Sequence, residues 1–65
     1  MGNNGMIVYN VYRSSKGLFG ISQVMKSGYN WDHAHQSGYH ETPELAEQWA
    51  TKHAGSIEHR IDRIF

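Results

Sequence analysis

The clearest structural signal in the chain lies in residues 42–55, which read TPELAEQWATKHAG. Thr42 is a favoured N-cap, Pro43 suits the first helical position, and Gly55 is a favoured C-terminal stop. Between them, apolar and small residues recur at intervals of three and four, as on the buried side of an amphipathic helix. The sequence therefore predicts a helix from Pro43 to Ala54.

The residues on either side of this helix carry strand signals. Residues 6–13 and 18–26 are rich in β-branched and aromatic types, with the turn cluster 14–17 between them. Residues 29–35 predict a third strand. Residues 56–65 fit either a returning strand or a second helix, and their isoleucine content favours the strand.

These elements predict an α+β fold, in which a small three- to four-stranded antiparallel sheet (β-β-β-α-β) carries one helix packed on one face. A chain of 65 residues is one domain. We expect residues 6–65 to form it and the polar, glycine-rich residues 1–5 to be a disordered tail. The expected core consists of Ile7, Val11, Ile21, Leu45, Trp49, Ile57 and Ile61.

The composition limits how so small a core is stabilised and where the protein resides. There is no cysteine, so the remaining supports are a metal ion, a second chain or an efficient core alone. No run approaches the ~20 apolar residues of a membrane span, and no leader-like segment is apparent, so we expect a cytoplasmic protein. The formal net charge is zero, but all six acids lie in residues 32–65. A chain so divided can pair with itself across a two-fold axis, which makes a homodimer one expected assembly.

A histidine-rich stretch is the candidate metal site. On a strand, the His-x-His pair would present both imidazoles on one face, as a zinc ion requires. The stretch lacks cysteine and any standard ligand spacing, so we expect no metal and no cofactor. If a metal binds, the candidate ligands are His33, His35 and His40.

No residue set has the spacing of a catalytic motif. The segment from Gly17 to Gly20 lacks the lysine and the following helix of a phosphate-binding loop. A domain of this size also has little volume for a concave, water-poor pocket. We therefore expect a protein that is not an enzyme.

Aromatic residues are concentrated before the helix, among basic residues. Six of them precede it, and one helix cannot cover so many. Either the core spreads over both faces of the sheet, or some aromatics line an open face. Tyrosine, tryptophan and arginine are typical anchors of protein interfaces. The expected partner-binding residues are Tyr12, Arg13, Lys16, Lys26, Tyr29 and Trp31.

These observations favour a small non-enzymatic protein-binding module. Free-standing chains of this size without a catalytic set are often accessory proteins of phages and mobile elements. Many of those inhibit a host defence complex by occupying its surface, as anti-CRISPR proteins do. The expected partner is accordingly a larger host protein or protein complex.

The alternative is a small nucleic-acid-binding domain that uses a basic, aromatic sheet face. Residues 38–46, which read GYHETPELA, resemble the closing Gly-aromatic-x-Thr-x-x-x-Ala pattern of the DNA-binding domain at the front of some phage-type integrases, with one extra residue. The resemblance implies a strand that enters a capped helix and a sheet that contacts DNA. The zero net charge argues against tight non-specific DNA binding.

Overall fold

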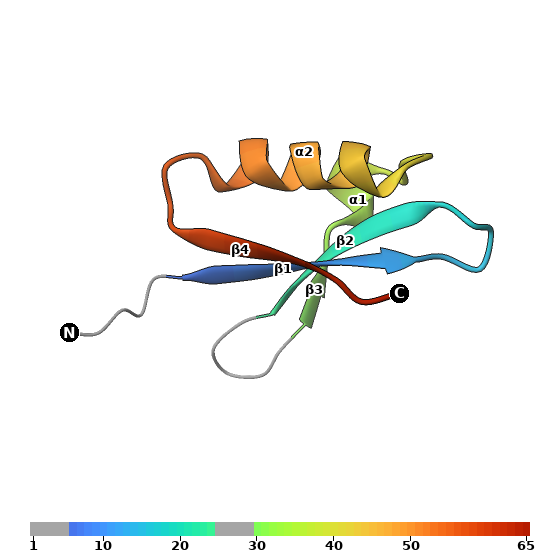
Figure 1. The fold of residues 1–65 in the computed structure, drawn as a ribbon, viewed down its shortest axis with the longest axis horizontal. Coiled ribbons are helices and arrows are strands. Elements are labelled where there is room, and N and C mark those ends of the chain that lie inside the picture. Colours follow the sequence, from blue (N-terminus) through green and yellow to red (C-terminus); the bar gives the residue numbers. More distant parts are fainter. Residues whose placement is uncertain (1–5, 25–29) are drawn as a thin grey trace.

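In a computed structural model, the chain forms a four-stranded sheet with one long helix along one face (Figure 1). The structure describes residues 6–24 and 30–65. In chain order the elements are β1 (Ile7–Arg13), β2 (Phe19–Val24), β3 (Asn30–Asp32), α1 (Ala34–Ser37), α2 (Pro43–Ala54) and β4 (His59–Arg63). The predicted α+β class and the single covering helix are confirmed. The tail after α2 forms a strand rather than a helix.

The β1–β2 hairpin forms where the turn cluster predicted it. The two strands pair antiparallel, with Val11 opposite Ile21. In the turn, the Ser14 hydroxyl accepts hydrogen bonds from the N–H groups of Lys16 and Leu18, at 3.3 and 3.2 Å. Gly17 has a φ of 81°, a conformation that residues with a side chain rarely adopt.

The helix α2 begins and ends at the predicted residues. The Thr42 hydroxyl accepts a hydrogen bond from the N–H of Leu45 at 3.2 Å, and Gly55 ends the helix with a φ of 63°. Its buried residues are alanines four positions apart, Ala46, Ala50 and Ala54. Because these side chains are small, the helix can lie close to the sheet.

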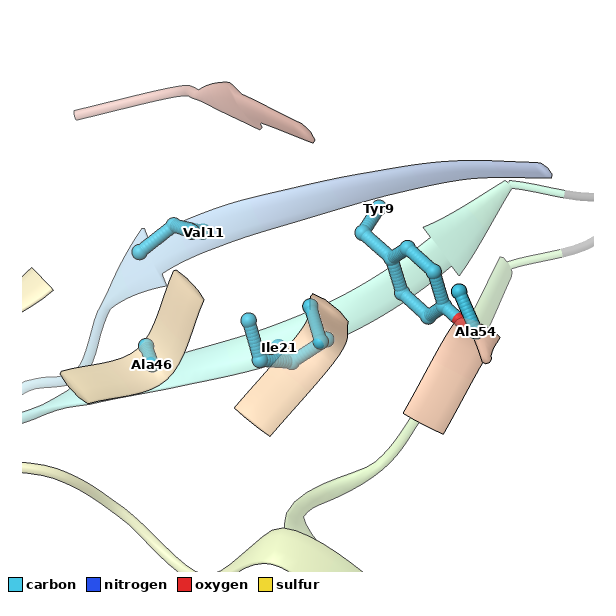
Figure 2. Close-up of a cluster of buried hydrophobic side chains, with 6 residues drawn as sticks. Tyr9, Val11, Ile21, Ala46 and Ala54 are labelled. Carbon is cyan, nitrogen blue, oxygen red and sulfur yellow. The ribbon is translucent and has the colours of Figure 1, made fainter. Parts of the chain in front are cut away.

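Three larger side chains from β1 and β2 complete the core beneath this alanine row (Figure 2). Tyr9, Val11 and Ile21 are fully buried, and Ile7, Phe19, Trp49 and Ile61 pack against them in partly buried positions. The predicted core is therefore confirmed at Val11 and Ile21, and partly at Ile7, Trp49 and Ile61.

Two predicted core positions are wrong. Leu45 is 46% exposed, because the alanines and not Leu45 are at the centre of the buried side of α2. Ile57 is 52% exposed, because it lies in the turn before β4 and not in the strand. Tyr9, which was not among the predicted core residues, takes the largest share of the interior.

The sheet is mixed, not wholly antiparallel as predicted. Its strand order is β3-β2-β1-β4, and β4 runs parallel to β1. The chain passes from β3 through α2 to the opposite edge, and a strand–helix–strand crossover leaves its two strands parallel. Since β3 and β1 are both antiparallel to β2, they run in the same direction. A β4 that is parallel to β3 is therefore parallel to β1 as well.

The third strand is shorter than predicted, because the chain leaves the sheet after three described residues. The N–H of His33 still donates to the carbonyl of Ile21 at 2.9 Å, and α1 then begins. The chain returns at His40, which exchanges two backbone hydrogen bonds of 2.8 Å with Phe19. β3, α1 and His40 together fill the edge beside β2.

The face of the sheet opposite α2 is covered by no described element (Figure 1), and we call it the open face. The strand registers assign to it Val8, Asn10, Tyr12, Gly20, Ser22, Val24, Asn30, Asp32, Arg60 and Asp62.

None of the described helices has the length and apolar character needed to cross a membrane.

Candidate functional site

Tyr12 lies on the open face and is fixed there by two neighbours. Its hydroxyl donates a hydrogen bond to Asp32 Oδ1 at 2.8 Å and lies 3.4 Å from the Tyr39 hydroxyl. The rings of Tyr12 and Tyr39 meet edge to face, with centroids 6.3 Å apart. Burial and the hydrogen bonds to Tyr39 and Asp32 raise the pKa of Tyr12 well above its usual range, so the hydroxyl stays protonated.

Gly20 makes room for this arrangement. Gly20 lies directly across from Tyr12 in the β1–β2 pair. A Cβ atom at this position would lie 2.7 Å from Cζ and from the hydroxyl oxygen of Tyr12, and 2.9 Å from Cε1 of Tyr39. The Tyr12 ring can therefore lie on the backbone only because residue 20 has no side chain.

Asp32 and Tyr39 belong to this site although neither was among the predicted partner-binding residues. Asp32 Oδ1 also accepts the N–H of Ala34 at 3.1 Å, so one carboxylate connects β1, β3 and the start of α1. Tyr39 is brought to Gly20 by the return of the chain after α1. An Asp two residues before a helical turn is a typical local acceptor, which was the available signal for Asp32, and the signal for Tyr39 was its place among the six aromatics before the helix.

An exposed apolar residue extends the site toward β4. The N–H of Ile64 donates to the carbonyl of Val11 at 2.9 Å, which continues the β4–β1 ladder and brings Ile64 beside Tyr12. Arg63, the preceding residue, extends its side chain to α2, so by alternation Ile64 faces the open side. Tyr39 and Ile64 are 47% and 58% exposed.

Of the other predicted partner-binding residues, Arg13, Lys16 and Trp31 are described by the structure, and they are not gathered around Tyr12. Arg13 ends β1 and Lys16 lies in the hairpin turn, and both are exposed at one end of the sheet. Trp31 is paired with Gln23, which puts it on the α2 side of the sheet, where it is 47% exposed. Lys26 and Tyr29 lie outside the described residues. Tyr12 and Trp31 therefore do not form one surface.

The three candidate metal ligands are separated. His33 is buried, 4% exposed, whereas His35 lies exposed on α1 and His40 pairs with β2. The prediction of a His-x-His pair on one strand face is wrong, because the strand ends at Asp32. In residues 6–24 and 30–65, no group of three or more His, Asp or Glu side chains is arranged to hold a metal ion.

His33 instead joins an aromatic cluster beneath the C-terminal half of α2. Its ring centroid lies 4.7 Å from that of His53 and 5.3 Å from that of Trp49, and its Nε2 is 2.9 Å from Gln23 Oε1. His53 stacks on Trp49, with ring centroids 4.6 Å apart, and its Nδ1 forms a hydrogen bond of 2.7 Å with the Tyr9 hydroxyl.

The surroundings of His33 in this cluster disfavour its protonated form. Burial and the nearby charge of His53 lower the pKa of His33, against smaller opposing contributions from a hydrogen bond with Gln36 and the charge of Asp32. Burial also raises the pKa of the Tyr9 hydroxyl. Tyr9 and His33 thus form a polar part of the core, and the exposed His53 contacts both of them from α2.

Comparison with known proteins finds no family model, no curated protein and no solved structure that matches this chain.

Proposed function

We propose that the protein acts by binding another protein in a stoichiometric complex, through the open face around Tyr12. The observation that carries this proposal is the pair of exposed apolar side chains, Tyr39 and Ile64, beside a tyrosine whose position is already fixed. An aromatic anchor that is ordered before binding loses little conformational entropy in the complex. Tyrosine is also among the residues that contribute most to protein interfaces.

The charges of the open face favour a protein partner over a nucleic acid. Asp32 and Asp62 both lie on it, and Asp62 holds Arg60 in an ion pair of 3.0 Å. Arg63 is likewise held on α2 by Glu47 at 2.7 Å. Carboxylates on the surface would repel phosphates, and nucleic-acid binding depends on neutralising them.

The balance of buried and exposed apolar side chains also supports association with another protein. Among residues 6–24 and 30–65, the large side chains that are fully buried are Tyr9, Ile21 and Val11. Seven large apolar residues in the same described ranges are 45–58% exposed: Met6, Trp31, Tyr39, Leu45, Ile57, Ile64 and Phe65. Contact with a second protein would remove part of this surface from water.

The outer side of α2 is the competing surface. A shallow hollow of about 700 Å³ lies along it, lined by His40, Glu44, Leu45, Glu47, Gln48, Trp49, Thr51 and Lys52. Leu45 and Trp49 are the apolar residues of this lining, and the other six residues are polar or charged. The open face, with its fixed tyrosine, is the better anchor site.

We further propose that the bound protein is a host protein or complex, and that binding inhibits it by covering its surface. This would make the chain a cytoplasmic accessory protein of a phage or mobile element. The support is the open face described above, since a domain with a surface suited to contact can act by occupying a site that its partner needs.

A pull-down of the tagged protein from nuclease-treated host lysate tests the binding surface. We expect one protein to be recovered in stoichiometric amount with the wild type. The double variant Tyr39→Ala/Ile64→Ala should recover at least about tenfold less, because loss of two interface anchors costs about 1–2 kcal/mol or more.

Leu45→Ala is the matched control, since it removes a similarly exposed apolar side chain from α2. Circular dichroism should show all variants folded. Recovery that depends on Leu45 and not on Tyr39 and Ile64 would move the site to α2. Recovery that disappears with nuclease treatment would support the nucleic-acid alternative.

A further inference from the structure

The two edges of the sheet are not equivalent. The edge beside β2 is filled by a strand of three residues, the α1 excursion and the bridge at His40. The opposite edge is β4, five residues long, and no described element pairs with its outer side. Unpaired edge strands can accept a further strand, and proteins usually protect them or use them for association.

The hydrogen bonds of β4 identify which of its groups face outward. The carbonyl of Glu58 accepts the N–H of Ile7, and the N–H of Ile64 donates to the carbonyl of Val11. The backbone N–H and carbonyl groups of the even-numbered residues therefore point toward β1. In a strand, neighbouring residues direct their backbone groups to opposite sides. The N–H and carbonyl groups of His59, Ile61 and Arg63 therefore point toward the free edge.

We propose that this edge binds a second copy of the chain, with the two β4 strands antiparallel and related by a two-fold axis at Ile61. This register uses all five residues of β4. Ile61 faces its own counterpart, and His59 faces Arg63 of the second copy, as hydrogen-bonded pairs. The outward-facing backbone groups of β4 are then all paired.

Charge complementarity selects this pairing. In the same register Arg60 lies opposite Asp62 of the second copy, and Asp62 lies opposite Arg60. These are the non-hydrogen-bonded positions of an antiparallel pair, where opposing side chains are closest. Both residues lie on the open face and already form an ion pair of 3.0 Å within the chain, with side chains 58% and 38% exposed. The dimer would join them into one cluster of four alternating charges.

The remaining long side chain of β4 does not obstruct the second strand. Arg63 extends to α2, where its guanidinium donates to Glu47 at 2.7 Å and to Glu44 at 3.3 Å. A two-fold axis perpendicular to the sheet also places both α2 helices on the same side. The open faces of the two copies then form one continuous surface of eight strands, so the dimer leaves the surface proposed above for partner binding accessible.

Sedimentation equilibrium of the purified protein tests the dimer without any partner, so the result is independent of the function proposed above. We expect the wild type to form a dimer. Arg60→Asp and Asp62→Arg should each weaken it about tenfold or more, because each change creates two like-charged pairs across the axis. The double variant Arg60→Asp/Asp62→Arg should dimerise like the wild type.

The decisive sample is an equimolar mixture of the two single variants. Arg60→Asp carries two acids at these positions, and Asp62→Arg carries two arginines. The mixture should therefore form a heterodimer, whereas each variant by itself should dimerise weakly. Circular dichroism checks that each variant is folded. Three outcomes would each overturn the proposal. They are a wild type that stays monomeric at its highest soluble concentration, single variants that dimerise normally, and a mixture that stays monomeric.

Discussion

The position of the Tyr12 ring depends on the absence of a side chain at Gly20. We expect Gly20→Ala to displace the ring, because the new Cβ would overlap Tyr12 and Tyr39. Displacement removes the hydrogen bond to Asp32, so the free energy of unfolding should fall by about 1–2 kcal/mol in urea titrations.

The same substitution made in a Tyr12→Ala background separates this effect from a general effect on the strand. Without the Tyr12 ring, we expect Gly20→Ala to cost clearly less, because only the contact with the exposed Tyr39 ring remains and alanine is otherwise better tolerated than glycine in a strand. An equal cost in both backgrounds would mean that Gly20 serves the backbone and not the tyrosine.

The buried His33 imidazole makes stability depend on pH. Its pKa is lowered in the folded protein from an ordinary value of 6.5, so the unfolded chain binds a proton more readily. The stabilising contribution is therefore present above about pH 6.5 and is lost as the pH falls toward the lowered pKa, at up to about 1.4 kcal/mol per pH unit.

We expect the unfolding free energy of the wild type to fall between about pH 7.5 and about pH 5.5, the interval around the ordinary histidine pKa. His33→Gln, which cannot take up a proton, should show a smaller fall. If the two proteins lost stability equally over this interval, His33 would not be the group responsible.

The contacts between residues of distant segments in the candidate site could not be predicted from the sequence. Tyr12 was predicted as a binding residue from its type alone. Its partners Asp32 and Tyr39 are 20 and 27 positions away and meet it only because β3 and the return after α1 lie beside β2. No spacing rule relates such residues, since their proximity depends on the path of the chain.

At the scale of elements, the sequence predicts the features that depend on neighbouring residues better than those that depend on pairing between distant strands. The helix α2 was predictable at both ends, because Thr42, Pro43 and Gly55 act on their immediate neighbours. The extent of β3 was not, since the chain leaves the sheet where the carboxylate of Asp32 accepts the N–H of Ala34. The prediction of His33 and His35 on one strand face failed for that reason.

The alanine row of α2 sets the distance between helix and sheet. Ala50 is fully buried, so we expect Ala50→Leu to force the helix away from β1 and β2 and to cost about 1–3 kcal/mol of unfolding free energy. Gln48→Leu, on the exposed side of the same helix, should change it by less than about 0.5 kcal/mol. Equal midpoints of urea denaturation for the two variants would show that the contact is loose.

At the scale of the whole molecule, the crossover through α2 determines which surfaces remain available. It brings β4 parallel to β1 at the far edge and leaves the helix on one side only. The open face and the outer edge of β4 are both consequences of this path. The sequence indicated three or four strands and one helix before the last segment, but the pairing of β4 with β1 depends on contacts across the entire chain.

Thiol labelling tests whether the open face or α2 contacts the partner, because the chain contains no cysteine of its own. Ser22→Cys introduces a thiol in the middle of the open face, and Gln48→Cys introduces one on the outer side of α2. Each tagged variant is labelled with a maleimide, alone and after capture of its partner from nuclease-treated lysate. We expect the captured partner to slow labelling of Ser22→Cys by about tenfold or more, because interface cores exclude solvent, and to leave Gln48→Cys unchanged. Protection of Gln48→Cys with unchanged labelling of Ser22→Cys would contradict the account.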